Sequence, residues 1–184
     1  MDYRQAVIHP EARIAKNATI VGNVVVEKDA VVLFNAVLRG DYGSHIVVGE
    51  GSNIQEGCCL HLGAKSDCVI GRGVTVGHGA IVHGCTIGDN TLVGMGSIVM
   101  DGAVIGENCI VAAGALVTSN TQVPDGMLVM GSPAKVRRPL TEQEIEQNRA
   151  DAEGYVAIGK DLVDSGIAWA GDQIPADAPL IAVK

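Results

Sequence analysis

The sequence contains few aromatic residues and few positive charges. One Phe, one Trp and three Tyr account for 3% of its 184 residues, so Val, Ile, Leu and Ala must fill the interior, which favours a narrow, repetitive core. Thirteen Lys and Arg stand against 21 Asp and Glu, which gives a net charge of −8, and no basic run occurs. This charge balance argues against a nucleic-acid partner and against binding to an anionic membrane surface.

Long hydrophobic runs are also missing. The longest stretch without a charged residue, 108–124, has 17 residues and is interrupted by Asn, Thr, Ser and Gln, so the sequence predicts no membrane span. The opening residues MDYRQAVIHP show the pattern of neither a secretion signal nor a transit peptide, so we expect a cytoplasmic location. The five cysteines are odd in number and form no CxxC motif, which indicates reduced thiols rather than a disulfide framework.

What the sequence does contain is a six-residue repeat. An aliphatic residue, always Ile, Val or Leu, recurs every six positions, and a second, usually small residue follows four positions later. An α-helix would spread such a repeat around its circumference, whereas short strands joined by tight turns place every repeated residue inside. The repeated aliphatic residues are Ile8, Ile14, Ile20, Val26, Val32, Leu38, Val48, Ile54, Leu60, Ile70, Val76, Val82, Ile87, Val93, Val99, Ile105, Val111, Val117, Val123 and Val129.

Three hexapeptides per coil predict an all-β fold, a parallel β-helix of about six to seven coils. Beyond it, Thr141 and Glu144 form a T-x-x-E capping box, which predicts an α-helix, although Gly154 and Gly159 each cost that helix about 1 kcal/mol relative to Ala. The Pro-rich end of the chain is expected to wrap over the surface or to be mobile. The expected β-helix domain, helix and tail are residues 1–140, 141–165 and 166–184.

The spacing of six is broken at only three places, after Leu38, Leu60 and Val82, where the next repeated residue follows ten, ten and five positions later. These three residues are three hexapeptides apart, so their units should stack on one side of the rod in successive coils. Insertions that drifted neutrally would scatter over all three sides. The residues that follow them, and that should point outward in one column, are Arg39, His61 and His83.

His61 and His83 on adjacent strands would have Cα atoms about 5 Å apart, close enough for two imidazoles to share one cation. His78 lies around a corner of the same coil, so a second copy of the chain would have to present its own His78 to this pair. Repeated around a closed three-fold ring, this arrangement gives three identical sites. Three neutral imidazoles and an open position are typical of catalytic zinc, and a purely structural ion that stabilises a trimer is the alternative.

Four segments of the chain carry a family resemblance: LRGD at 38–41, SNIQEGCCLH at 52–61, VGHGAIVHGC at 76–85 and GMGSIV at 94–99. Together they resemble the γ-class carbonic anhydrases and their relatives, sometimes labelled ferripyochelin-binding proteins, over residues 8–140. The resemblance implies a left-handed β-helix homotrimer that holds zinc, or else iron or cobalt, at its subunit interfaces. The ligands it implies are His61 and His83 of one chain and His78 of the next.

The resemblance also implies a reaction, the reversible hydration of carbon dioxide to bicarbonate by a metal-bound hydroxide. Arg39 and Asp41 would form an ion pair, and Gln55 would hydrogen-bond the metal-bound solvent. The segment that follows the first ligand histidine is short and lacks the acidic loop of the best-studied type, which lowers the hydratase activity to be expected. Two further candidates, Asn53 beside the glutamine and Tyr155 on the predicted helix, occupy positions that match motif residues of some relatives.

Two other functions stay open at this point. Hexapeptide acyltransferases that use acetyl coenzyme A share the predicted rod and a terminal motif like GSPAKVRRPL at 131–140. Such an enzyme usually needs one catalytic histidine, not two stacked histidines with a third around the corner. A non-catalytic scaffold stabilised by the metal ion is the third possibility.

Overall fold

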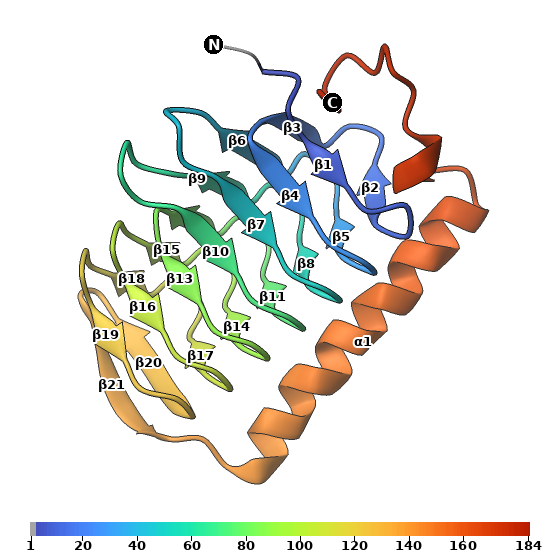
Figure 1. The fold of residues 1–184 in the computed structure, drawn as a ribbon. Coiled ribbons are helices and arrows are strands. Elements are labelled where there is room, and N and C mark those ends of the chain that lie inside the picture. The colour runs from blue at the N-terminus through green and yellow to red at the C-terminus, as the bar shows by residue number, and fades with distance from the viewer. Residues whose placement is uncertain (1–2) are drawn as a thin grey trace.

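The computed structural model describes residues 3–184 and shows a β-helix with one long α-helix packed along its side (Figure 1). Residues 1–2, which the sequence analysis counts with the rod, lie outside the described residues. Short parallel strands stack into three sheets, one on each side of the coil, and form a solenoid of about seven coils. The prediction of an all-β parallel β-helix of hexapeptide repeats with a C-terminal helix is confirmed.

A complete coil contributes one strand to each sheet, and sheet 2 gains the antiparallel strands β21 and β22 at its two ends. Sheet 1 contains β1 (Val7–Ile8), β4 (Val24–Val26), β7 (Ile46–Val48), β10 (Cys68–Ile70), β13 (Thr86–Ile87), β16 (Val104–Ile105) and β19 (Gln122–Val123). Sheet 2 contains β2 (Arg13–Ala15), β5 (Val31–Val32), β8 (Asn53–Ile54), β11 (Thr75–Val76), β14 (Leu92–Val93), β17 (Ile110–Val111), β20 (Met127–Gly131), β21 (Ala134–Pro139) and β22 (Ala168–Ala170). Sheet 3 contains β3 (Thr19–Gly22), β6 (Val37–Gly40), β9 (Cys59–His61), β12 (Ile81–His83), β15 (Ile98–Val99) and β18 (Leu116–Val117).

The repeated aliphatic residues stack in columns inside the rod. In sheet 3, Leu38 pairs in register with Leu60, and Leu60 with Val82, and all three are fully buried. The small residues of the same units, such as Cys58 and Ala80, are buried as well, so large and small side chains alternate across a narrow core. The three breaks of the repeat therefore lie on one side, sheet 3, as the count by hexapeptides predicts.

The turns between strands use left-handed backbone conformations. Asn90 and Asn108 have φ values of 54° and 53°, which Asn tolerates better than most residues, and their side chains stack through an Nδ2–Oδ1 hydrogen bond of 2.7 Å. Gly22 at φ 82° is required by close packing, because a Cβ there would lie 1.9 Å from the carbonyl oxygen of Gly40 in the next coil.

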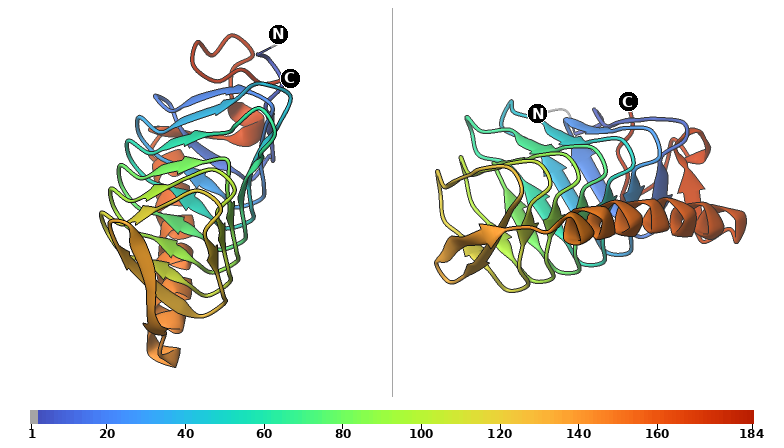
Figure 2. Two further views of the ribbon diagram at one scale, coloured as in Figure 1. Left: turned by 90° about the vertical axis from the view of Figure 1, so that its left-hand side faces the viewer. Right: turned by 90° about the horizontal axis from the view of Figure 1, so that it is seen from below.

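Helix α1 (Glu142–Asp164) begins at the capping box, where Thr141 and Glu144 each accept a hydrogen bond from the other's backbone N–H. It then runs back along sheet 2 toward the first coil (Figure 2). A Cβ on Gly159 would lie 2.7 Å from Cγ2 of Val31, so this glycine weakens the helix locally but lets it approach the rod. Within residues 3–184, no helix is long and apolar enough to cross a membrane.

The tail after α1 closes the first end of the rod. Strand β22 pairs antiparallel with β2, and the chain then crosses the open face of the first coil (Figure 1). Ala182 N–H donates to the carbonyl of Ile20 at 2.8 Å, and Ala6 N–H donates to the carbonyl of Ala182 at 3.1 Å. Ile181 is 1% exposed and joins the hydrophobic core, so the tail supplies the lid of the coil stack.

We expect Ile181→Ala to lower the free energy of unfolding by about 2–4 kcal/mol, because it empties a fully buried position at the end of the core. The midpoint of urea unfolding measures the change. Leu180→Ala is the matched control: its side chain is 40% exposed, and its replacement should cost less than about 1 kcal/mol. Equal losses for the two variants would contradict the role of the tail as a lid.

Candidate metal centre

Two histidines lie side by side at the ends of β9 and β12. His61 and His83 are direct register partners, their ring centroids are 5.0 Å apart, and Nδ1 of His61 lies 3.0 Å from Nε2 of His83. A tetrahedral zinc ion with Zn–N bonds of 2.0–2.1 Å needs two ligand nitrogens about 3.3–3.4 Å apart. A shift of a few tenths of an ångström would therefore let both nitrogens bind one ion.

The other nitrogen of each ring is held by a carboxylate. Nε2 of His61 lies 2.9 Å from Oδ1 of the buried Asp41, and Nδ1 of His83 lies 2.9 Å from Oδ1 of Asp101. A carboxylate on the far nitrogen fixes the orientation of the ring and keeps the near nitrogen free of its proton for a metal ion. Both histidines therefore have the surroundings of metal ligands.

Arg39 belongs to the same cluster. It follows Leu38 in β6, the strand next to β9, and its Nη1 forms an ion pair with Oδ2 of Asp41 within one chain. Asp41 thus uses both carboxylate oxygens: Oδ2 contacts the guanidinium of Arg39, and Oδ1 contacts Nε2 of His61. This pairing holds the carboxylate in place.

His78 lies apart from this pair, after β11 at the corner between sheets 2 and 3. Its Nδ1 is 2.7 Å from Oε2 of Glu56, and its side chain is 47% exposed. It therefore also has a carboxylate beside one ring nitrogen, but this contact is an ion pair by distance and not a hydrogen bond as in the other two histidines. Across residues 3–184, no three or more His, Cys, Asp or Glu side chains of one chain form a metal site.

Gln55 and Asn53 lie beside His78 rather than beside the histidine pair. Gln55 Nε2 donates to Oδ1 of Asn53 at 3.1 Å, Asn53 Nδ2 donates to Oγ1 of Thr75 at 2.9 Å, and Gln55 Oε1 accepts from the backbone N–H of His78 at 3.2 Å. Both amides are buried. This chain of hydrogen bonds fixes the Gln55 side chain next to the backbone of His78.

Tyr155 of α1 completes this second group. It lines a cavity of about 380 Å³ between α1 and sheet 2 together with Gln55 and His78. Burial raises the pKa of the Tyr155 hydroxyl, and the nearby carboxylates of Glu56 and Asp151 raise this pKa further. The phenol therefore keeps its proton at neutral pH and can donate a hydrogen bond.

The predicted residues thus form two half-sites on one chain. The first half-site is the histidine pair with its polar partners, Arg39, Asp41, His61, His83 and Asp101, and the second consists of Asn53, Gln55, Glu56, His78 and Tyr155. The sequence analysis missed Asp101. The sequence did contain a signal for it: Asp101 is an acidic residue two positions after Val99, which belongs to the hexapeptide that follows the His83 unit on the same side of the rod.

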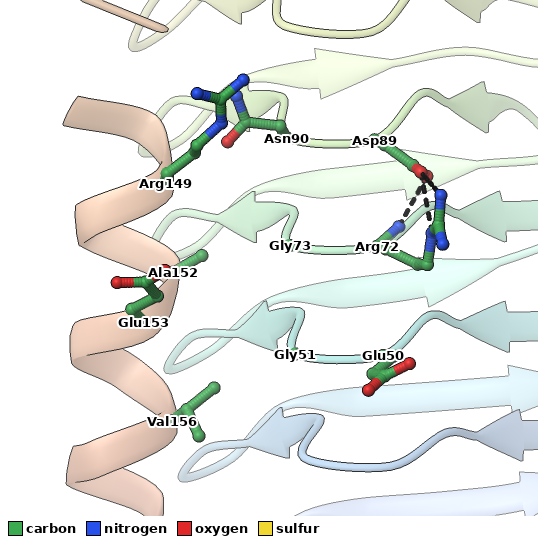
Figure 3. A pocket seen from close by; sticks show the side chains of 10 residues that line it. All are labelled: Glu50, Gly51, Arg72, Gly73, Asp89, Asn90, Arg149, Ala152, Glu153 and Val156. Atoms are coloured by element: carbon green, nitrogen blue, oxygen red, sulfur yellow. Dashed lines mark hydrogen bonds and ion pairs between the residues drawn. The ribbon is translucent and has the colours of Figure 1, made fainter. Parts of the chain in front are cut away.

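A different hollow of about 410 Å³ lies between α1 and another corner of the rod (Figure 3). It is lined by the exposed ion pair of Arg72 with Asp89, by Asn90 and by Arg149 of the helix. None of the residues of the two half-sites lines it. This hollow is therefore separate from both half-sites.

An apolar row runs along sheet 3 beside the histidine pair. Val37, Cys59, Ile81 and Ile98 are register neighbours on successive strands, and all four side chains are exposed. Cys59 and Ile81 each precede the histidine of their strand by two positions, so row and pair share one face of the sheet.

Comparison with known proteins shows which family has this sequence and this architecture. Residues 84–119 match the family described as bacterial transferase hexapeptide (six repeats). A relative named "Probable carbonic anhydrase" from Methanocaldococcus jannaschii is 49% identical over 155 residues, which cover 84% of this chain and 97% of the relative. The carnitine operon protein CaiE of Salmonella agona is 42% identical over 149 residues, which cover 81% of this chain and 75% of the relative.

The chain belongs to the hexapeptide-repeat family that contains these relatives. The resemblance drawn from the four sequence segments is thereby confirmed. A solved structure with the same fold is that of a hexapeptide transferase family protein from Anaplasma phagocytophilum. It is 46% identical, with a TM-score of 0.81, and the match covers 85% of this chain and 92% of that chain.

We expect Asp101→Ala to weaken zinc binding about 10- to 100-fold, because His83 loses the carboxylate that orients its ring. Competition with a metal-sensitive dye measures the affinity. Asp89→Ala is the matched control, because it removes the same charge from an ion pair at another corner of the rod (Figure 3). Zinc affinity that is unchanged in the Asp101 variant would show that this carboxylate does not support the site.

Proposed function

We propose that the chain forms a cytoplasmic homotrimer that hydrates carbon dioxide reversibly to bicarbonate, using a metal ion, most simply zinc, at each subunit interface. The observation that carries this proposal is the pair of facing imidazole nitrogens, Nδ1 of His61 and Nε2 of His83, each on a ring whose other nitrogen is held by a carboxylate. Iron and cobalt are accepted by the same imidazole ligands.

The need for a third ligand supports the trimer. His61 and His83 supply two nitrogens, whereas His78 of the same chain lies on a different corner and points its free nitrogen away from its own Glu56. A neighbouring copy packed on the apolar row of sheet 3 would bury Val37, Cys59, Ile81 and Ile98. His78 of that copy would then complete the ligand set, and closure over three copies gives three equal sites.

His61 and His83 of one chain and His78 of the next would hold the ion, which would supply a hydroxide nucleophile at neutral pH. The chain's own residues orient the imidazole rings and the solvent. Asp41 and Asp101 hold the two rings, and Arg39 fixes Asp41. The side-chain amide of Gln55 is held by its hydrogen bond to Asn53 and lies beside His78. In this position the amide can orient solvent or bicarbonate.

Tyr155 closes this side of the site. Its protonated hydroxyl lies in the cavity with Gln55, so it can donate a hydrogen bond to a carboxylate product without adding negative charge.

Acyl transfer is the second candidate. The similar solved structure from Anaplasma phagocytophilum is named a hexapeptide transferase family protein, and the name of the relative CaiE does not mention carbonic anhydrase. The ion pair of His78 with Glu56 would give such an enzyme a histidine base. Acetyl transfer from acetyl coenzyme A by metal-free protein would favour this candidate over hydration.

The test is a carbon dioxide hydration assay on protein of known metal content, loaded with zinc, iron or cobalt. We expect activity in proportion to bound metal and its loss in His83→Ala, with the trimer retained. Hydration rates no higher than the uncatalysed rate from pH 6 to pH 9, with each of the three metals, would contradict the proposal. Collapse of His83→Ala to a monomer would instead indicate a structural metal ion in a non-catalytic scaffold.

Complementation between subunits tests the shared site. When His78→Ala and His83→Ala chains are co-expressed in equal amounts, three quarters of the trimers are mixed, and each mixed trimer has one interface with all three histidines. Bound metal and hydration rate should therefore recover to about a quarter of the wild-type values, whereas each variant alone has none.

The matched control mixes His61→Ala with His83→Ala. Both changes fall in the same half-site, so no interface regains three histidines and neither metal nor activity should return. Recovery in this control, or none in the first mixture, would show that the ligands are not divided between chains as proposed.

A further inference from the structure

The cavity next to the second half-site is much larger than carbon dioxide requires. It measures about 380 Å³ and lies between α1 and strands β11, β14 and β17. A cavity of about 150 Å³ is enough for benzene, and small-molecule sites usually measure about 300–1,000 Å³. The space can therefore hold a chain of several carbons or a phenyl ring in addition to a carboxyl group.

The two ends of the cavity differ in chemistry. Gln55, His78 and Tyr155 form the polar end, which belongs to the candidate site. Away from it, the lining is mostly apolar and includes Leu92, Ile110, Met95 and Ala113, with Asp151 of α1 as its one carboxylate. Apolar walls contribute nothing specific to a triatomic gas, but they stabilise an alkyl or aryl group by removing it from water.

The charges around the cavity exclude an anionic tail. No Lys or Arg lines it, and the carboxylate that does, Asp151, accepts a hydrogen bond from Gln147 at 2.8 Å. A phosphate or a second carboxylate on the ligand would face this negative charge without a cation to pair with. The tail that fits is neutral and apolar.

Bicarbonate and a monocarboxylate present the same planar group of a carbon with two oxygens, and they differ in the third substituent. We infer that the substrate class of this site includes carboxylic acids or their derivatives with an uncharged apolar tail of several carbons. The carboxyl end lies at Gln55, His78 and Tyr155, and the tail lies along Leu92 and Ile110. This inference rests on the proposed function, since it extends the same site from bicarbonate to tailed carboxylates.

Calorimetric titration of the zinc-loaded trimer with acetate, propionate, butyrate and hexanoate tests the inference. Each added methylene that enters the apolar part should tighten binding about threefold to fourfold, so hexanoate should bind about a hundredfold more tightly than acetate. Bicarbonate in excess should weaken hexanoate binding, because both ligands use the same polar end.

Ala113→Trp fills the apolar part from its rim, and in this variant the gain from acetate to hexanoate should fall below about tenfold. Ala157→Trp is the matched control, because this alanine is exposed on α1 and lines none of the cavities described. It should keep the wild-type dependence on chain length, which separates filling of the cavity from the general effect of a surface tryptophan.

Affinity that does not change with chain length in the wild-type protein would overturn the inference, even if carbon dioxide hydration is normal. A chain-length dependence equally retained in Ala113→Trp would overturn it as well. Rising affinity that Ala113→Trp abolishes, in protein without hydratase activity, would support the ligand class and count against the proposed function alone.

Discussion

The in-register parallel pairing of successive coils is the constraint on which everything else in this molecule depends. Because each coil repeats the path of the one before, residues 22 positions apart, such as His61 and His83, become direct neighbours. The backbone hydrogen bonds between coils then fix the spacing of the two imidazoles before any metal ion is present. The fold thus provides a rigid base for the site, and the side chains need only the correct rotamers.

Carboxylates complete what the backbone begins. All three histidines of the candidate site have one ring nitrogen on an acidic side chain, His61 on Asp41, His83 on Asp101 and His78 on Glu56. His45 also has a carboxylate, that of Asp67, at 3.0 Å from its Nδ1, so what sets His61 and His83 apart is that they are in addition direct register partners with facing ring nitrogens. If the three histidines bind one ion as proposed, their division between two faces of the chain would make assembly a condition of function.

Much of this could be predicted from the sequence, because a hexapeptide count converts directly into position on a side of the rod. The column of Arg39, His61 and His83 followed from that count alone. Asp101 did not, because its contact with His83 depends on the path of a turn and on side-chain rotamers, which the repeat does not specify. For the tail, the sequence predicts only that it wraps over the surface or is mobile; its pairing with the first coil could not be predicted, because residues 166–184 carry no repeat.

The same tail has a consequence for solubility. A stack of coils that ended bare would expose unpaired N–H and C=O groups at both ends, a template on which coils of other molecules could add and polymerise head to tail. In sheet 2, β22 pairs antiparallel with β2 at one end and β21 pairs antiparallel with β20 at the other. An antiparallel strand does not continue the parallel repeat, so in sheet 2 these two strands cover the edges to which a further coil would add.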